Sequence, residues 1–247
     1  MRGAQGFPVR LRFSKRGKVR FISHRDVARC FERAFRIVEL PLAFTQGFSP
    51  RPKISFGLAL SVAHESVAEY LDVELREPVA LAALPEALSD ALPEGLEVTG
   101  AVALADRAPA LQEAVTATAW EIELVDPDGH PPAPSVVASL AATALDASSL
   151  PITRVRKGRE ATEDIRPSLR RLEVQDFSHL DDLVGVVLTV EVATQPVSVR
   201  PGELLDACVP GFGARRTLRT NQWIERDGLR LEPLDADPRG AREARAS

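Results

Sequence analysis

Apolar and polar residues alternate along residues 9–13, where valine, leucine and phenylalanine are separated by arginines. A period of two predicts a strand with one face in a core. After turn residues around Gly17, residues 19–21 continue the extended pattern. The chain is therefore expected to begin with a strand whose second face is basic.

The period changes to that of a helix after Ser23, whose residue type is favoured at an N-cap. Between Val27 and Val38, apolar residues recur at helical spacing and form one stripe. Pro41 is incompatible with a helix interior and is expected to end this element.

The remaining elements of the first half alternate in the same way. Residues 53–57 and 69–75 are typical of two strands joined by a loop, and residues 79–92 of a helix with Pro85 near its start. Residues 96–102 predict a closing strand. The order β-α-β-β-α-β is typical of a ferredoxin-like unit.

The same order recurs more loosely in the second half. Strands are predicted at 118–124, 152–157, 184–192 and 218–224, and helices at 135–145 and 201–209. The polar stretch between 157 and 174 is expected to be irregular. We therefore predict an α+β fold of two tandem ferredoxin-like units.

The predicted boundary between the units falls near residues 105–115. The first unit is expected to cover residues 1–104 and the second residues 115–232. Residues 233–247 are rich in Asp, Arg, Ala and Pro, and we expect them to form a disordered tail.

Charge changes this picture because it is segregated along the chain. Residues 1–60 hold thirteen Lys and Arg against three Asp and Glu, whereas residues 61–150 hold two against sixteen. Such a separation governs encounter and partner choice rather than fold. One face near the N-terminus is therefore expected to meet an anionic partner, and the acidic region is expected to avoid it.

Composition excludes several classes of function. The two cysteines, Cys30 and Cys208, lie far apart and predict buried thiols in a reducing compartment. No cluster of Cys and His has metal-ligand spacing, so we expect no metal and no cofactor. The first residues lack the apolar core of a signal peptide, and no apolar run is long enough to span a membrane. A cytoplasmic protein without membrane contact is expected.

Four arginines share one face of the first predicted helix. At 3.6 residues per turn, Arg25, Arg29, Arg33 and Arg36 fall within about 80° of one another, opposite the apolar stripe. Glu32 lies in the same sector and can neutralise part of their charge. These arginines form either a solvated helix face or a site for an anion.

The neighbouring cations favour the second interpretation. Other basic residues flank the same helix in sequence: Arg10, Arg12, Lys15, Arg16, Lys18, Arg20, Arg51 and Lys53. Guanidinium groups suit phosphate because their fork bonds two oxygens at once. A phosphate-bearing ligand is therefore expected at this end of the chain.

The segment 45–56 is a second candidate for ligand contact. Gly47 permits a bend, while Pro50 and Pro52 stiffen the backbone, so that Gln46 and Phe48 point in fixed directions. The phenylalanine is either a stacking surface for a base or an apolar anchor of the loop.

His24 lies at the first turn of the predicted helix, among cations and close to Asp26. The helix terminus and the arginines disfavour its protonated form, whereas the carboxylate favours it. It either caps the turn or acts as a general acid or base.

Residues 9–75 resemble the N-terminal part of a bacterial family that is associated with radical-SAM proteins and has no settled function. The matching positions are Arg12–Lys15, Gly17, Arg20–His24, Asp26, Arg33–Ala34, Leu40–Pro41, Thr45–Phe48, Pro50, Pro52–Phe56 and Glu69–Asp72. Residues 151–170, with Asp164–Pro167, resemble its second half. Arg25 stands where the family pattern has leucine, and Ser49 and Arg51 stand where it has Asn and His.

The resemblance implies an accessory module that is fused to a radical-SAM protein or encoded beside one, and that presents an RNA substrate. With cysteines only at positions 30 and 208, this chain lacks the Cys-x3-Cys-x2-Cys motif that holds an iron–sulfur cluster. A separate protein must therefore generate the radical. A fold-level analogy also runs to the tandem ferredoxin-like endoribonucleases of CRISPR systems.

We therefore expect a non-catalytic accessory protein that binds RNA through its basic N-terminal face. The residues expected to contact RNA are Arg20, His24, Arg25, Arg29, Gln46, Phe48, Arg51 and Lys53. Two alternatives remain open: a metal-independent endoribonuclease with His24 as acid or base, and an adaptor whose basic face binds an acidic protein.

Overall fold

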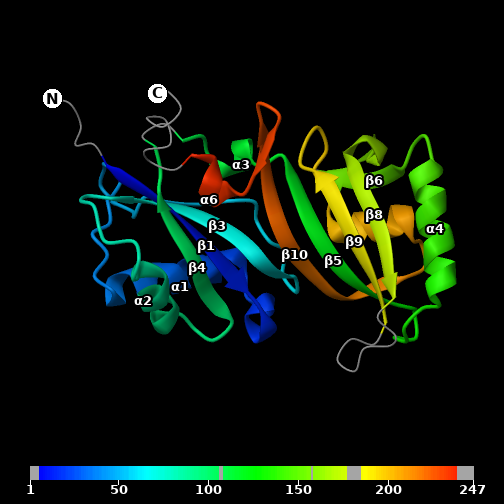
Figure 1. Ribbon diagram of the computed structural model, residues 1–247, viewed down its shortest axis with the longest axis horizontal. Coiled ribbons are helices and arrows are strands. Elements are labelled where there is room, and N and C mark those ends of the chain that lie inside the picture. Colours follow the sequence, from blue (N-terminus) through cyan, green and yellow to red (C-terminus); the bar gives the residue numbers. More distant parts are fainter. Residues whose placement is uncertain (1–5, 106–107, 157, 177–184, 238–247) are drawn as a thin grey trace. The chain divides into compact units, whose positions relative to one another are not determined.

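The computed structural model describes the chain except residues 1–5, 106–107, 157, 177–184 and 238–247 (Figure 1). It divides into two compact units. Unit 1 comprises residues 1–115 and 222–247, and unit 2 comprises residues 116–221. Both contain helices and mainly antiparallel strands, so the predicted α+β class is confirmed.

Unit 1 is built from two strand–helix–strand segments joined in series. Its elements are β1 (Phe7–Lys15), η1 (Gly17–Phe21), α1 (His24–Ile37), β2 (Ile54–Phe56), β3 (Glu65–Leu75), α2 (Leu84–Ala91), β4 (Leu96–Ala103) and α3 (Leu111–Ala114). The chain re-enters the unit through the end of β10 (Gly213–Arg226), β11 (Leu229–Leu231) and α6 (Pro233–Ala236).

Strand β1 lies at the centre of this sheet. It pairs antiparallel with β3 and with β4, while β2 pairs with the other edge of β3. The order is therefore β4-β1-β3-β2, and the end of β10 also lies beside β3. The short β2 reflects the two prolines just before it, which cannot donate ladder hydrogen bonds.

One face of β1 and β3 forms the main core with α1 and α2. Val9, Leu11 and Phe13 point to this face because successive strand residues alternate. The Phe13 and Phe31 rings meet at 4.8 Å between centroids. Ser23 caps α1 as predicted, since its Oγ accepts a hydrogen bond from the amide of Asp26 at 3.3 Å.

The opposite face of the same strands is covered by α3 and α6. Ala68 and Tyr70 of β3 pack there against Leu111, with Leu234 beside them. Arg10 also points to this face and is fully buried. Its guanidinium donates two hydrogen bonds to Asp72, at 2.7 and 2.8 Å, and one to the carbonyl of Pro233 at 3.1 Å.

Two predicted elements of unit 1 differ from the structure. Residues 17–21 form the 3₁₀ helix η1 rather than an extended strand, because Gly17 adopts a φ of 66° and turns the backbone. The second helix begins at Leu84 rather than at residue 79, with Pro85 in its first turn, where a proline is tolerated.

Unit 2 repeats the alternation of strands and helices. Its elements are β5 (Ala117–Val125), α4 (Pro134–Asp146), β6 (Pro151–Arg156), β7 (Arg159–Asp164), η2 (Arg166–Ser168), β8 (Leu169–Asp176), β9 (Val186–Ala193), α5 (Pro201–Cys208) and the first part of β10. The strand order is β10-β5-β9-β8. Strands β6 and β7 form a separate two-stranded hairpin.

The prediction of a strand near residues 152–157 was confirmed, whereas the prediction of an irregular stretch from there to residue 174 was wrong. The strand expected at 152–157 corresponds to β6, which pairs with β7 instead of joining the main sheet. Residue 157, the last of the predicted range, lies outside the described residues. The position beside β9 is taken by β8, in the stretch expected to be irregular. Leu172 and Val174 of β8 alternate with charged and polar residues, and that period of two was the missed signal.

The end of the chain also differs from the prediction. Strand β10 is fourteen residues long, and its last part and α6 belong to unit 1 rather than to a second unit ending at 232. Residues 233–236 of the expected tail form α6, because Pro233 and Ala236 are buried against unit 1. Residues 238–247 lie outside the described part. No helix in the described residues is long and apolar enough to cross a membrane.

The Arg10–Asp72 pair provides a stability test. We expect Arg10→Met to lower the free energy of unfolding by about 3 kcal/mol, because Asp72 and the Pro233 carbonyl lose their partner in a buried site. Chemical denaturation measures the change in the free energy of unfolding, and hydrogen exchange of the β1 and α6 amides measures it locally. The double variant Arg10→Met/Asp72→Leu should recover most of it. An equal loss in both variants would show that packing, not charge pairing, is responsible.

Candidate functional site

The arginines of α1 lie on its solvent-exposed side, as predicted. Arg25 and Arg33 are exposed and make no ion pair in the described part of the chain. Arg29 pairs with Asp26 at 3.0 Å, but the arginine side chain remains largely exposed and the aspartate about half exposed. Such a pair contributes little and leaves the guanidinium accessible. Arg36 donates to the carbonyl of Glu32 at 3.2 Å.

The two arginines of β1 do not join this face. Arg10 is fully buried against Asp72, and Arg12 pairs with Glu232 at 3.2 Å. Both point to the side of the sheet opposite α1, because they alternate with Val9 and Leu11. The expectation that they extend the basic surface was wrong for this reason.

Lys15 is also removed from the surface. Its side chain is almost fully buried, and its Nζ donates to the carbonyls of Arg20 at 3.3 Å and Ile22 at 3.1 Å. Burial lowers the pKa of this ammonium, and the nearby carboxylate of Glu69 partly offsets that effect. Lys15 therefore holds a turn in place rather than contacting a ligand.

Two residues predicted to bind RNA are paired with carboxylates. Arg20 lies 3.5 Å from Glu65, the first residue of β3. Lys53 donates to both oxygens of Glu74, at 2.9 and 3.0 Å, near the last residue of β3. Their charges are locally compensated, which weakens them as phosphate contacts.

These two ion pairs lie at opposite ends of β3 and so separate the predicted site residues into two groups. Glu65 and Glu74 are nine residues apart on one strand, which corresponds to about 30 Å. Arg20, His24 and Arg25 therefore lie near one end of β3, and the loop before Lys53 lies near the other. The structure does not bring the eight predicted residues into one site.

The loop between α1 and β2 presents the second group. Phe44 bridges to Pro52, and Thr45 accepts a hydrogen bond from the amide of Arg51 at 3.0 Å, so that the ends of the loop are held together. Phe48 at its tip is fully exposed. Gln46 and Arg51 are exposed beside it. The interpretation of Phe48 as an apolar anchor of the loop is wrong, because its ring has no core to enter.

His24 contacts the edge of the core at the start of α1. Its ring meets Phe56 edge-on at 4.9 Å between centroids. Partial burial and the charge of Lys15 lower its pKa, which favours the neutral imidazole. A cavity of about 10 Å³ beside it, lined also by Lys15, Glu69 and Tyr70, has room for about one water molecule.

Two titratable neighbours of His24 in this cavity are engaged elsewhere. Lys15 binds two backbone carbonyls, and the Tyr70 hydroxyl lies 3.5 Å from Glu232 on the other side of the sheet. Neither is free to exchange a proton with a substrate held at His24. Lys15 and Tyr70 therefore do not supply a proton partner for His24, whereas Glu69 also lines the cavity.

Phe21 was missed by sequence reasoning. It is the last residue of η1, and 58% of its surface is exposed. The Arg20 guanidinium lies 4.6 Å from its ring centroid. The available signal was Gly17, which predicts a turn rather than a strand and therefore frees Phe21 from a core position.

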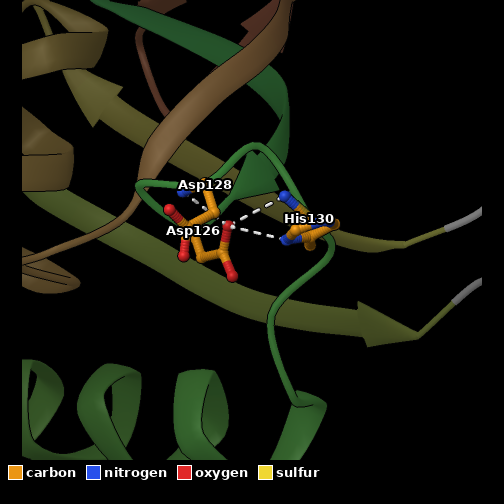
Figure 2. Close-up of side chains that lie close together, drawn as sticks. All are labelled: Asp126, Asp128 and His130. Atoms are coloured by element: carbon orange, nitrogen blue, oxygen red, sulfur yellow. Dashed lines mark hydrogen bonds and ion pairs between the residues drawn. The ribbon is translucent and has the colours of Figure 1, made fainter.

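A cluster in unit 2 resembles a metal site but has a structural explanation. Asp126, Asp128 and His130 come together in the loop after β5 (Figure 2). One Asp126 oxygen accepts hydrogen bonds from the backbone amides of residues 128 and 130, at 3.0 and 2.8 Å. An aspartate that ties a turn together in this way is common in loops. The prediction that the chain holds no metal is not tested by this cluster.

A second polar region of unit 2 is self-compensated. Arg154 of β6 pairs with Glu163 and Glu203 and donates to the carbonyl of Ser198. Arg154, Ser198 and Glu203 border a cavity of about 370 Å³ near the start of α5. Because the guanidinium is already saturated, Arg154 does not extend the basic surface of unit 1.

The comparisons identify a family without assigning a reaction. None of the curated proteins matches the chain. A solved structure titled "Crystal Structure of a Cbf5-Nop10-Gar1 Complex" is similar over 89% of this chain, with 12% identity and a TM-score of 0.45, and the chain spans 49% of that structure's length. A likeness of that size carries no functional argument. Residues 9–201 match the model of a family described as an uncharacterized protein conserved in bacteria (DUF2344), and the chain belongs to this family.

Proposed function

We propose that this chain is a non-catalytic protein that binds RNA through one surface of unit 1. The surface comprises Arg16, Lys18, Arg25 and Arg33, and we refer to it as the η1–α1 basic surface. The observation that carries the proposal is that all four side chains are exposed and lack a carboxylate partner in the described residues. Free guanidinium groups in water are suited to phosphate oxygens.

The extent of this surface favours a polymer over a small anion. Helix α1 has fourteen residues and is therefore about 21 Å long. Arg25 lies in its first turn and Arg33 two turns later, while Arg16 and Lys18 precede the helix. Charges spread over such a length contact successive phosphates of one strand.

We further propose that the protein acts beside a separate radical-SAM enzyme. This step rests on the family resemblance of residues 9–75 and on the absence of clustered cysteines in the sequence. The acidic segment 61–150 is the proposed contact for that enzyme, since repulsion keeps it from RNA. Crosslinking and affinity purification from a native host, with the RNA sequenced and the proteins identified together, tests both partners.

Two tandem ferredoxin-like units remain part of the proposal. In each unit, a connection that contains a helix joins each outer strand to the strand two positions away in the sheet. The strand orders are β4-β1-β3-β2 and β10-β5-β9-β8. These orders support the proposed arrangement, with the β6–β7 hairpin as an insertion in the second unit.

Salt dependence is the first test of the RNA proposal. With about four phosphate contacts on a single strand, a rise from 50 to 200 mM salt should weaken binding by about 50-fold. Arg25→Gln/Arg33→Gln should weaken binding and reduce the slope of log K against log salt by about 1.4. Fluorescence anisotropy with a labelled oligoribonucleotide measures both quantities.

A matched variant separates this surface from net charge. Arg159→Gln/Arg171→Gln removes two exposed arginines from unit 2 and should leave the slope unchanged. Equal losses in the two double variants, or a flat salt response of the wild type, would rule out a local phosphate-binding surface.

The separation along β3 gives a test of the loop residues. Because Phe48 lies near the far end of β3, Phe48→Ala should weaken the binding of strands that span about 30 Å, by about 1–3 kcal/mol if a base stacks on the ring. Shorter strands that cover only the η1–α1 basic surface should be insensitive. The measurement is a series of oligoribonucleotides of increasing length. Equal sensitivity at every length would place Phe48 in a single site with α1.

His24 provides a test against the enzymatic alternative. Its imidazole should titrate below the ordinary pKa of 6.5, and bound RNA should raise that pKa because phosphate favours the protonated ring. Histidine NMR signals recorded with and without an oligoribonucleotide measure the change. RNA cleavage in EDTA that His24→Ala abolishes without affecting binding would instead identify an endoribonuclease.

A further inference from the structure

Phe21 is an aromatic side chain presented to solvent within the η1–α1 basic surface. More than half of its area is exposed, and it lies between Lys18 and Arg25 in sequence. Val62, which is also exposed, belongs to the neighbouring loop, whose Ala63 amide donates to the carbonyl of Arg20 at 2.8 Å. An exposed phenylalanine among cations is not explained by the packing of unit 1.

The backbone that carries Phe21 is fixed on both sides. Lys15 Nζ donates to the carbonyl before it, that of Arg20, and to the carbonyl after it, that of Ile22. The amide of Gly17 donates to Glu65 Oε1 at 2.7 Å, and the amide of Arg16 donates to the carbonyl of Gly95 at 2.8 Å. Phe21 therefore projects from a turn that is anchored to β1, β3 and the start of β4.

The anchor itself is unusual because it uses a buried lysine. Burying an ammonium is costly unless its donors are satisfied. Here two of the groups that satisfy Lys15 are the carbonyls that flank Phe21. A backbone turn held this way loses little conformational freedom when a ligand binds, which favours affinity.

Arg20 supports the ring from one side. Its guanidinium carbon is 4.6 Å from the centroid of Phe21, and its Nη1 is 3.5 Å from Glu65 Oε1. A cation against an aromatic ring is favourable, and the buried carboxylate of Glu65 keeps the guanidinium in position. The remaining exposed ring surface is available to a flat ligand.

We propose that Phe21 is a stacking platform for a base of single-stranded RNA, whose flanking phosphates are held by Lys18 and Arg25. The inference rests on the proposed function and narrows its ligand to unpaired RNA. In a duplex the bases are already stacked on one another, and a ring on a protein surface reaches only splayed or unpaired bases.

The surrounding charges favour a nucleic acid over a protein as the occupant. Arg16, Lys18 and Arg25 are exposed and lie within five residues of Phe21 in the chain. Two carboxylates of this region are already engaged, since Glu65 binds Arg20 and the amide of Gly17, and Asp26 binds Ser23 and Arg29. An exposed aromatic ring that is close in the chain to unpaired cations complements a base flanked by phosphates.

The test compares a short single-stranded oligoribonucleotide with an abasic strand of the same length. Phe21→Ala should weaken the binding of the base-bearing strand by about 5- to 150-fold and leave the affinity for the abasic strand unchanged. Phe21→Trp should retain the affinity of the wild type. Phe44→Ala is the matched control, because it removes another exposed phenylalanine, from the loop near the far end of β3. Since Phe21 is exposed, its variants should fold, and their circular dichroism checks this.

A strand that carries 2-aminopurine gives an independent readout. Its fluorescence should change on binding to the wild type and not on binding to Phe21→Ala at saturating protein. If wild type binds both strands equally and Phe21→Ala changes neither, the platform is wrong while the RNA proposal stands. If wild type binds neither strand at low salt, both proposals fail. Unchanged RNA binding with loss of a crosslinked protein partner would assign Phe21 to that partner and overturn the inference.

Discussion

The burial of β1 on both faces is the constraint on which the arrangement of unit 1 depends. Strand β1 lies between β3 and β4, with α1 and α2 packed on one face and α6 on the other. Every cation in this strand must therefore find a partner inside the protein. Arg10 finds Asp72, Arg12 finds Glu232, and Lys15 finds two backbone carbonyls. The result is that a strand rich in basic residues contributes no free charge to the surface.

This constraint determines which cations remain for a ligand. Among the described residues, the turn after β1 and the outer side of α1 contribute exposed cations without a carboxylate partner, as do Arg51, Arg76 and Arg159 elsewhere in the chain. Lys15 links the core to the exposed surface, because its buried ammonium fixes the turn that presents Phe21. A core interaction thus sets the geometry of the proposed ligand surface.

Unit 2 shows the same dependence of a local pattern on its surroundings. The basic residues of β6 are apart from the main sheet, and Arg154 forms ion pairs with Glu163 and Glu203. The strand that fills the place beside β9 is β8, which follows a short hairpin and η2. A plausible strand was found in the sequence at 152–157, but hydrogen-bond partners decide which strand enters a sheet.

The sequence by itself determined the α+β class, the N-cap at Ser23, the apolar stripe of α1 and the exposed arginines opposite it. These features depend on local periods and on residues that are close in the chain. The tertiary structure alone decided which cations are neutralised, because the partners of Arg10, Arg12 and Lys53 lie 62, 220 and 21 positions away. It also separated the loop at Phe48 from the start of α1, since that distance is set by the length of β3 and not by the spacing of the residues in the chain.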